Sequence, residues 1–505
     1  MRCGRPFGIG RARPYAVRTV KEDWTNPVLK NEIFIDNVFL PQASGGEIAH
    51  VYPATGEVNG TAVLGGSAEI LEAVEAAKRA APLWESIGPA ERRTRIGKLA
   101  DIVEAWGEKF RDLAAAEVGM PTRSFAARHK FAVDWIRTYQ GWADKIGGDV
   151  TATLDAGRFE YTRFEPYGVV GIVLTWNSAL LSLTMKIPAA LAAGNTVVVK
   201  PSEITPYTPL LFAKACVEAG IPAGVVNIVP GAVEAGETLV AHPDVEKISF
   251  TGGLRAASAM MRTGAPLVKP FCFELGGKSS HLVFPDADVQ LAAKVVCAGL
   301  SNAGQSCTFG SRIYVHESVY AAFRAALVER SAEIVLGDPT DDRTTMGPIV
   351  SAAARDRIVA LIEASTGRKQ AKLVSGGKVP RLDPPFSSGF FVQPAVFEDV
   401  DPKCALVREE IFGPVMSVLP FADEPQAIAA ANDTDFGLSN YVHTADLRRA
   451  IRVTAQLKSG MVYVNDASRT NPGAPFGGYR RSGIGYEGGR AGLDEFLRRK
   501  TVGLV

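Results

Sequence analysis

The sequence lacks the motifs that would indicate a metal site or a disulfide framework. No two of its six cysteines are spaced as C-x-x-C, and its six histidines form no H-E-x-x-H motif. Neither a zinc ribbon nor a helical zinc site is therefore indicated, and we predict no metal. Cysteines without pairing motifs fit the reduced thiols of a cytoplasmic protein, which is the location that we expect.

The sequence also lacks an excess of charge of either sign. Lys and Arg number 55 and Asp and Glu number 54, which leaves a net charge of +1. Without a global electrostatic field, we expect no nucleic acid and no membrane among the partners. Hydrophobic residues make up 47% and charged residues 22% of the chain, which is typical of globular proteins and excludes a disordered or fibrous one. The 505 residues, at about 150 per domain, predict roughly three domain-sized units, as in a large enzyme.

No hydrophobic run predicts a membrane span. Residues 167–185 carry no charge and reach the necessary length, but Asn177 and several hydroxyl residues interrupt them. A buried strand, a turn and the start of a helix are predicted there instead. The first 21 residues carry six basic residues and no acid, with glycines and prolines among them. We expect residues 1–30 to be a disordered extension or an over-long gene start, with a targeting segment as the alternative.

The hydrophobic pattern predicts an α/β fold. Short runs rich in Val and Ile begin 22 to 30 residues apart, and segments of helix length separate them. This alternation is typical of βαβ units in a doubly wound parallel sheet. A second α/β unit begins near Gly276. Strands are expected at 33–40, 168–174, 195–200, 225–229 and 247–250, and helices at 67–87, within 90–119, and at 208–220, 287–305 and 319–337.

Polar and glycine-containing segments follow the predicted parallel strands. Open parallel sheets bind ligands at the carboxyl ends of their strands, so these segments are the first place to expect a site. No G-x-G-x-x-G motif is present, which argues against an ordinary dinucleotide fingerprint. Gly277-Lys278-Ser279 is not a P-loop either, because Cys272 stands where that motif needs its first glycine. The segments at the strand ends are 175–177, 200–203, 230–231 and 251–253.

Two residues indicate covalent catalysis by a thiol. Cys307 stands in SNAGQSCTFG between glycines and polar residues, whereas free cysteines are more often small buried hydrophobes. Glu274 interrupts the apolar run PFCFELGG at the end of a predicted strand. A carboxylate in such a setting is costly unless it acts as a base or has a partner. The pair suggests a thiolate that attacks and a base that later activates water.

These residues lie within motifs that resemble those of the NAD(P)-dependent aldehyde dehydrogenase superfamily, from about residue 31 to residue 505. The resemblance implies a doubly wound parallel-sheet cofactor domain (31–148 and 167–275) and a second α/β catalytic domain (276–472). It also implies a small bridging β-element for oligomerisation (149–166 and 488–505), and hence a homodimer or homotetramer. The motifs are TWN (175–177), VVVKPSE (197–203), FTGG (250–253), ELGGKS (274–279), GQSC (304–307), EEIFGPV (409–415), NDTDFGLS (432–439) and PFGGYRRSGIGYEGG (475–489).

The resemblance implies a role for each catalytic candidate. Cys307 would be the nucleophile, and the Asn177 amide with the Cys307 backbone N–H would hold the oxyanion. Glu274 would deprotonate the water that hydrolyses the thioester. Lys186 and Glu487 match the relay partners of this base, although such a pair is more often a structural ion pair. Because relatives that pass the acyl group to coenzyme A typically lack this base, Glu274 favours a free carboxylic acid as product.

The resemblance also implies NAD as cofactor. Glu203 would accept hydrogen bonds from the ribose hydroxyls and would repel the 2′-phosphate of NADP. Gly253 and Ala257 depart from the usual Ser-x-x-x-Gly pattern, and NADP, which Arg255 would admit, is the alternative. The matching cofactor positions are Thr175, Trp176, Lys200, Ser202, Glu203, Gly231, Phe250, Thr251, Gly252, Gly253, Leu275, Gly276, Glu410 and Phe412.

The matching substrate positions carry small or flexible side chains and one aromatic ring. They indicate a roomy tunnel for a medium or bulky, hydrophobic and largely uncharged aldehyde. Two alternatives of another class remain open, a cofactor-independent thiol esterase and a catalytically silent binding protein on the same fold. The substrate positions are Ser178, Ser182, Met185, Ser306, Thr308, Thr470 and Phe476.

Overall fold

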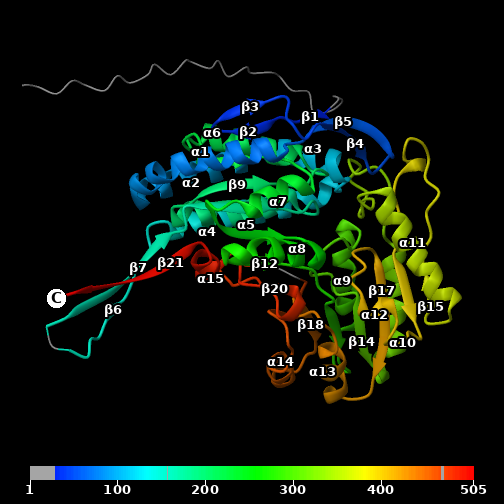
Figure 1. Cartoon of the computed structure of the whole chain (residues 1–505). Helices are drawn as coiled ribbons and strands as arrows, with labels where there is room; N and C mark the ends of the chain where they lie inside the picture. Colours follow the sequence, from blue (N-terminus) through cyan, green and yellow to red (C-terminus); the bar gives the residue numbers. More distant parts are fainter. Residues whose placement is uncertain (1–28, 156, 468–470) are drawn as a thin grey trace, which may run out of the picture.

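The larger part of the molecule is built on an eight-stranded sheet (Figure 1). The computed structural model describes residues 29–155, 157–467 and 471–505. Five neighbouring strands of this sheet run parallel, and β20, β2 and β3 join them in antiparallel pairs. The order is β20 (Gly483–Ile484), β12 (Phe271–Glu274), β11 (Val245–Thr251), β8 (Val169–Val173), β9 (Thr196–Lys200), β10 (Val226–Ile228), β2 (Ile33–Ile35) and β3 (Val38–Leu40).

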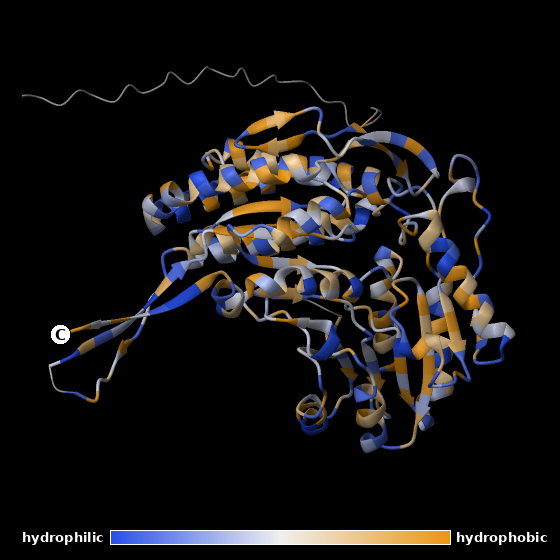
Figure 2. Ribbon diagram, viewed as in Figure 1, coloured by the Kyte–Doolittle hydropathy of each residue, from blue (hydrophilic) through white to orange (hydrophobic). Residues whose placement is uncertain are grey.

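Helices cover both faces of this sheet, because successive strand residues are apolar on both sides. In β9, Val197 and Val199 pack into one core while Val198 packs into the other. Figure 2 colours this strand as strongly hydrophobic. One face is covered by α2 (Gly88–Ala105), α4 (Phe125–Trp142), α5 (Ala179–Ala193) and α6 (Tyr207–Glu218), and the other by α1 (Ser67–Ser86), α7 (Val233–Ala241) and α8 (Leu254–Gly264). The predicted doubly wound parallel sheet is confirmed.

A second α/β unit is built on a seven-stranded sheet with its own hydrophobic core. Six strands are parallel and β15 is antiparallel at one edge. The order is β15 (Lys372–Ser375), β16 (Ala395–Glu398), β17 (Val415–Phe421), β14 (Arg312–His316), β13 (Ser280–Val283), β18 (Ser439–His443) and β19 (Met461–Val464). Its helices are α9 (Val289–Ala298), α10 (Glu317–Ala332), α11 (Ala352–Gly367), α12 (Ala405–Arg408), α13 (Glu424–Asn432) and α14 (Leu447–Thr454).

Two small sheets complete the fold. The antiparallel strands β21, β7 and β6 form an arm that projects away from both large sheets (Figure 1). They span Leu497–Leu504, Phe159–Pro166 and Val150–Thr151, and the second small sheet consists of β1 (Leu29–Lys30), β5 (Glu57–Val63) and β4 (Glu47–Tyr52). The remaining helices are α3 (Gly107–Val118) and α15 (Gly489–Asp494), with 3-10 turns at Thr122–Ser124, Ala265–Leu267, Gly299–Asn302, Phe386–Ser388 and Arg480–Ser482.

Three predicted elements are wrong in detail. The strand expected at 33–40 is a hairpin, because Asp36 and Asn37 both have positive φ values of 52° and 61° and reverse the chain. The helix expected at 287–305 ends at Ala298 and tightens into a 3-10 turn before the chain leaves it with Ala303 at a φ of 51°. The bridging segment expected at 488–505 begins with helix α15 and becomes a strand only at Leu497.

The strand order creates a topological switch point between β8 and β11. From β8 the chain proceeds through β9 to β10 on one side, and then returns to the other side of β8 to form β11 and β12. The connections after β8 and β11 therefore diverge and open a crevice at the carboxyl ends of these strands. Within the described residues, no helix combines the length and the apolar character that crossing a membrane requires.

Candidate active site

The sheet register brings the predicted strand-end residues into one row. Lys200 lies opposite Val173, and Val173 lies opposite Phe250 on its other side. One step further along the strands, Thr251 lies opposite Glu274. The segments that follow β8, β9, β11 and β12 therefore emerge side by side at the switch point, although they are far apart in the sequence.

The loop that carries Cys307 is fastened to the segment after β8. Asn177 donates a hydrogen bond from Nδ2 to the carbonyl oxygen of Gln305 (3.1 Å). Asn302 in turn donates from its own Nδ2 to the carbonyl oxygens of Asn177 (3.2 Å) and Gln305 (3.1 Å). Asn177 is buried and Cys307 is half-buried. These contacts hold the Asn177 amide beside the cysteine loop and leave the second amide hydrogen of Asn177 without a described acceptor.

The surroundings of Cys307 disfavour the thiolate at rest. Burial raises the pKa of the thiol to about 12, and the carboxylates of Glu410 and Glu274 add to this effect. The backbone N–H groups of Cys307 and Thr308 act in the opposite direction, because they donate toward the sulfur. These two backbone donors therefore favour a negative charge at or next to the Cys307 sulfur.

Glu274 is a buried carboxyl group without a hydrogen-bond partner. Its side chain stands at the end of β12, and neither carboxyl oxygen is bonded to another described residue. Burial, and then repulsion from Glu487, raises the pKa of Glu274 well above its usual value, while Lys186 opposes this shift. An unsatisfied acid of this kind is costly for stability, so it is expected mainly where it serves chemistry.

Lys186 and Glu487 form a fully buried ion pair next to Glu274. Lys186 donates from Nζ to Glu487 and to the hydroxyl of Ser249 (2.9 Å). Burial alone would lower the pKa of Lys186, but the adjacent Glu487 carboxylate outweighs it and raises that pKa. The pair joins α5 to the segment after β20 across 301 residues of sequence. A contact of this kind is consistent with a structural ion pair and equally with a proton relay.

We expect the substitution Lys186→Met to destabilise the fold by about 3–5 kcal/mol, because Glu487 would remain buried without a counter-charge. The double variant Lys186→Met/Glu487→Leu should recover most of this loss. Chemical denaturation of the purified variants measures the effect. As a control, Lys78→Met removes an exposed ion pair with Asp244 and should leave the stability nearly unchanged, because solvent screens such a pair. Equal losses for Lys186→Met and Lys78→Met would contradict this account.

The end of β9 holds a buried cation and an accessible carboxylate. Lys200 donates from Nζ to the carbonyl oxygens of Pro201 (3.2 Å) and Gly231, and it lies 3.9 Å from Glu203. The Glu203 side chain is 41% exposed. Ser202 is buried, and its hydroxyl accepts from the backbone N–H of Ile204 (3.3 Å). Gly231 has no room for a side chain, because a Cβ would lie 2.7 Å from Ala235 and 2.8 Å from the Gly65 carbonyl oxygen.

The N-terminus of α8 faces the same crevice directly after β11. Gly252 donates to the carbonyl oxygen of Glu274 (3.1 Å), and Gly253 caps the helix with an extended backbone. A Cβ on Gly253 would meet no heavy atom within 4 Å. The side chain of Ala257 is buried in the core under the helix, and Arg255 is exposed in the first turn. Free amides at such a helix start suit an anion such as a pyrophosphate.

Glu410 and an aromatic pair form the other wall of the crevice. The Glu410 carboxylate accepts from the backbone N–H of Gly277 (2.9 Å), and burial raises its pKa. A Cβ on Gly276 would lie 1.9 Å from this carboxylate, so only glycine permits the contact. Phe412, with a φ of 53°, packs its ring edge-on against Trp176 at 5.6 Å. Leu275 is buried beside them and donates to the Ser482 carbonyl oxygen (2.9 Å).

These features suit a dinucleotide. An exposed carboxylate beside a buried lysine, a helix N-terminus with open space, and a second carboxylate next to an aromatic pair line up along the strand ends. Thr175 and Trp176, which follow β8, are half-buried in the same region. The sequence model of the "Aldehyde dehydrogenase family" matches residues 39–502 of the chain.

The chain belongs to the aldehyde dehydrogenase family. It is 40% identical over 496 residues to an aldehyde dehydrogenase of Enchytraeus buchholzi, which covers 97% of both chains. It is 38% identical over 471 residues to a betaine aldehyde dehydrogenase of Brucella melitensis, which covers 93% of this chain and 96% of that relative. As a member of this family, the protein is an oxidoreductase that acts on aldehydes.

The fold agrees with solved structures of this family. PnpE from Pseudomonas sp. WBC-3 superimposes with a TM-score of 0.91 and 37% identity, over 94% of this chain and 98% of that chain. PnpE has also been solved in complex with nicotinamide adenine dinucleotide, with the same TM-score. The aldehyde dehydrogenase-like architecture expected from the sequence is therefore confirmed.

The predicted substrate residues of the dehydrogenase lie on several elements. Ser178, Ser182 and Met185 lie at and after the start of α5, at the helical spacing of one face. On the cysteine loop, the hydroxyls of Ser306 and Thr308 are 3.1 Å apart. Phe476 is buried and pairs its backbone with Glu487, which ties it to the Lys186 ion pair. Thr470 lies outside the described residues.

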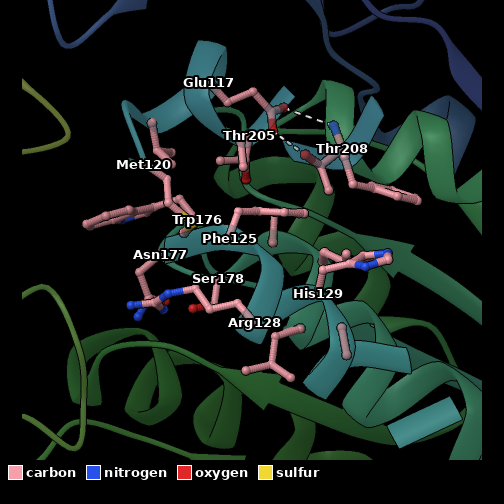
Figure 3. A pocket seen from close by; sticks show the side chains of 17 residues that line it. Glu117, Met120, Phe125, Arg128, His129, Trp176, Asn177, Ser178, Thr205 and Thr208 are labelled. Atoms are coloured by element: carbon pink, nitrogen blue, oxygen red, sulfur yellow. Dashed lines mark hydrogen bonds between the residues drawn. The ribbon is translucent and has the colours of Figure 1, made fainter. Parts of the chain in front are cut away.

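One cavity adjoins this region. It is bounded by α3, α4, the start of α6 and the segment from Trp176 to Leu181 (Figure 3). Of the predicted site residues, Trp176, Asn177 and Ser178 line it, whereas Ser182, Met185, Ser306, Thr308 and Phe476 do not.

Sequence reasoning missed several residues that shape the site. Gln305 donates to the carbonyl oxygens of Asn302 (3.2 Å) and Pro348 (3.1 Å) and accepts from Val350 N–H (2.9 Å), so its side chain fixes the cysteine loop. Its position inside GQSC is a signal that could have identified it. Lys278 is buried with no partner for its amine, and burial lowers its pKa to about 7. It lies in the ELGGKS motif, which is the signal that could have identified it.

The prediction of no metal remains a prediction. Within the described residues, one group of possible ligands, Glu75, His242 and Asp244, brings its atoms within 4.8 Å of one another. Asp244 already binds Lys78 (2.7 Å), and its backbone N–H donates to His242 (3.1 Å). These contacts account for the group without an ion.

Proposed function

We propose that the protein oxidises a medium or bulky aldehyde to the carboxylic acid with NAD, through a thioester on Cys307. The observation that carries this proposal is the convergence of Cys307, Asn177 and the unpartnered Glu274 at the switch point, next to a crevice that suits a dinucleotide. Membership of the aldehyde dehydrogenase family supplies the reaction class.

In the first step, the Cys307 thiolate attacks the carbonyl carbon of the aldehyde and gives a thiohemiacetal. The negative charge that forms on the oxygen is stabilised by the Asn177 side-chain amide and the Cys307 backbone N–H. Asn177 is suited to this because its backbone carbonyl oxygen is bonded to Asn302 and one hydrogen of its side-chain amide is bonded to Gln305. Losing one such donor typically costs ~10²–10³ in rate.

NAD, when bound, accepts the hydride that the thiohemiacetal carbon releases. The family's structures with NAD support this choice of cofactor, since PnpE was solved with it. Glu203 supports it as well, because an exposed carboxylate near the adenosine ribose would repel the 2′-phosphate of NADP. Arg255, exposed at the start of α8, is the feature that favours NADP as the alternative.

In the last step, Glu274 takes a proton from water, and the hydroxide attacks the thioester carbon. The acid leaves and the Cys307 thiolate is regenerated. The buried position of Glu274 without hydrogen bonds makes it a strong base once it has lost its proton. The presence of this base supports hydrolysis over transfer to coenzyme A.

The raised pKa of Glu274 gives a pH dependence with a definite sign. The protonated group cannot act as a base, and because its pKa is raised, the active carboxylate forms only at a higher pH than an ordinary glutamate requires. We therefore expect the rate of thioester hydrolysis to rise with pH over a range above the usual pKa of a glutamate, by up to about tenfold per pH unit below the pKa of Glu274. Single-turnover kinetics across this range measure the rate. A rate that falls or stays flat over the same range contradicts the assignment.

We expect Gly253→Ser to strengthen NAD binding by ~10-fold or more, because a hydroxyl there can donate to the pyrophosphate. The side chain fits, since nothing lies within 4 Å of an added Cβ. Titration calorimetry measures the Kd. Gly252→Ser is the matched control, since its Cβ would lie 2.3 Å from the Phe250 ring, and it should not tighten binding. An unchanged Kd for Gly253→Ser would show that the pyrophosphate does not pass this position.

We also propose that the arm of β6, β7 and β21 joins copies of the chain into a homodimer or homotetramer. Val150, Phe159 and Leu504 on the arm are about half exposed or more, at 69%, 48% and 51%. Unpaired edge strands with such side chains need cover. The mass of the full chain in solution, from light scattering, tests this proposal.

The lack of a disulfide among the described cysteines supports a cytoplasmic location.

The experiment that tests the proposed function is NADH and NADPH formation by the purified protein with a panel of aldehydes. The panel includes straight-chain, branched, aromatic and charged aldehydes, and betaine aldehyde because relatives are named for it. NAD-dependent turnover to the free acid is expected. Turnover with NADP alone would overturn the cofactor assignment, and faster formation of acyl-coenzyme A than of acid would overturn the hydrolytic step.

A further inference from the structure

Arg128 is a cation in the cavity beside the active site, and it has no carboxylate partner. The residue lies on α4 and lines the cavity together with Asn177 and Ser178. Its guanidinium donates a single hydrogen bond, to the hydroxyl of Ser301 (2.9 Å). Among the described residues, no acidic side chain forms an ion pair with Arg128. Burial lowers the pKa of Arg128, and no nearby carboxylate opposes this effect.

Arg128 is half-buried, and a guanidinium held against a largely apolar cavity without a counter-charge is costly. It keeps its positive charge, and it offers five donors, of which one is used in a hydrogen bond to a described residue. Structural arginines of this chain show the contrast. Arg312, which is fully buried, donates to the carbonyl oxygens of Lys278, Ala430 and Ala431. Arg128 therefore makes fewer hydrogen bonds to the described residues than Arg312 does, and its other donors are free to bind a ligand.

The position of Arg128 connects it to the reacting end of the site. Ser301, its partner, lies in the 3-10 turn Gly299–Asn302 that leads into the cysteine loop. The next residue, Asn302, binds the carbonyl oxygens of Asn177 and Gln305. The residue that binds the guanidinium, Ser301, is thus the sequence neighbour of Asn302, which links Asn177 to the loop of Cys307.

The other charged group of the cavity is not available to Arg128. Glu117 accepts from the backbone N–H groups of Tyr207 (2.6 Å) and Thr208 (3.0 Å) and from the Thr208 hydroxyl. These bonds commit it to the N-terminus of α6. Figure 3 shows Glu117 and Thr208 on one side of the cavity, and Asn177, Ser178 and Arg128 on the opposite side. The wall between them is mostly apolar, with Met120, Phe125, Ala132, Trp176 and Leu180.

We propose that Arg128 binds an anionic group, a carboxylate, at the far end of the aldehyde substrate. The substrate class is then an aldehyde acid, with an apolar body between the carbonyl at Cys307 and the carboxylate at Arg128. The planar guanidinium suits a carboxylate because it can donate two parallel hydrogen bonds. This inference rests on the proposed function, and it replaces the uncharged substrate expected from the sequence with one that carries a negative charge.

The first experiment compares matched aldehydes with the full-length wild-type protein and NAD. The pairs are adipic semialdehyde with hexanal, and para-carboxybenzaldehyde with benzaldehyde. Within at least one pair, the carboxylate-bearing aldehyde should show a kcat/KM at least ~30-fold higher, mainly through a lower KM, since a buried charge pair is expected to contribute binding of that order. Betaine aldehyde, whose cationic group would meet Arg128, should be the poorest substrate of the panel.

The second experiment uses variants of this contact. Arg128→Met should reduce the preference for the carboxylate within the pair by ~30-fold or more, and Arg128→Lys should retain part of it, because the charge remains without the planar fork. Ser301→Ala is the matched control. It removes the only described hydrogen bond of Arg128 but leaves the charge, so the preference should persist. Adipate, an unreactive probe, should inhibit hexanal oxidation in wild type and lose this inhibition in Arg128→Met.

The outcomes separate this inference from the proposed function. Turnover of aldehydes without a preference for the carboxylate in either pair overturns the role of Arg128 and leaves the proposed function standing. A preference that survives Arg128→Met also overturns it, provided that the variant still binds NAD. No NADH from any aldehyde of the panel would overturn the proposed function, and adipate binding that depends on Arg128 would then still support the anion site.

Discussion

Replacing Cys307 by alanine is expected to reduce aldehyde oxidation by at least ~10⁴-fold, because the variant has no nucleophile to form the thiohemiacetal. The cofactor crevice lies on the strand ends and on α8, so NAD binding should remain close to that of the wild type. Ester hydrolysis, which needs the same thiol, should disappear together with dehydrogenation. Steady-state kinetics and a titration of NAD binding measure the two effects separately.

Cys297→Ala is the matched control for this result. Cys297 is another free, half-buried cysteine, and it lies on α9. Its replacement should leave turnover within a few-fold of wild type. Dehydrogenase activity that persists in Cys307→Ala, or that disappears equally in both variants, would contradict the role of Cys307.

Glu274→Gln is expected to separate the two halves of the reaction. Glutamine fills the same space beside Lys186 and Glu487 but cannot accept a proton from water. The variant should release about one NADH per active site in a fast first turnover and then slow by ~10²–10⁴-fold, because the thioester accumulates. Stopped-flow absorbance of NADH followed by steady-state measurement detects both phases. The rise of the wild-type rate with pH should also be lost.

The control here is Glu398→Gln. Glu398 is a buried carboxylate paired with Arg324 and Lys372. It lies on β16 of the seven-stranded sheet, whereas Glu274 ends β12 of the eight-stranded sheet. It should keep the wild-type steady-state rate apart from a loss of stability. A Glu274→Gln variant that turns over like wild type, or that shows no first turnover at all, would mean that hydrolysis is not its step.

The parts of the fold that the sequence predicts well are those with a strong local pattern. The strands β8 and β9 are short runs rich in Val and Ile followed by polar segments, so their ends could be located within a few residues. The wrong elements depend on single residues with unusual φ values. Asp36 and Asn37 turn an alternating run into a hairpin, and Ala303 ends a helical pattern that the sequence continues to Gln305.

The candidate site is less visible in the sequence because its contacts join distant segments. Lys186 and Glu487 are separated by 301 residues, and Asn177 and Gln305 by 128. Motifs could nominate these residues, but the hydrogen bonds that fix them depend on tertiary structure. Arg128 had a local signal that could have been used. Counted from Phe125, the residues Arg128, His129 and Ala132 follow after three, four and seven positions and share one helical face.

The central claim is that the acyl group passes through Cys307. The most direct measurement is mass spectrometry of Glu274→Gln after mixing with NAD and a substrate aldehyde of the panel, followed by peptide mapping. The account predicts a mass increase equal to the acyl group on the peptide that contains Cys307, only when NAD is present, and none in Glu274→Gln/Cys307→Ala. An acyl group on another residue, or turnover of the wild type with no covalent adduct in the variant, would contradict it.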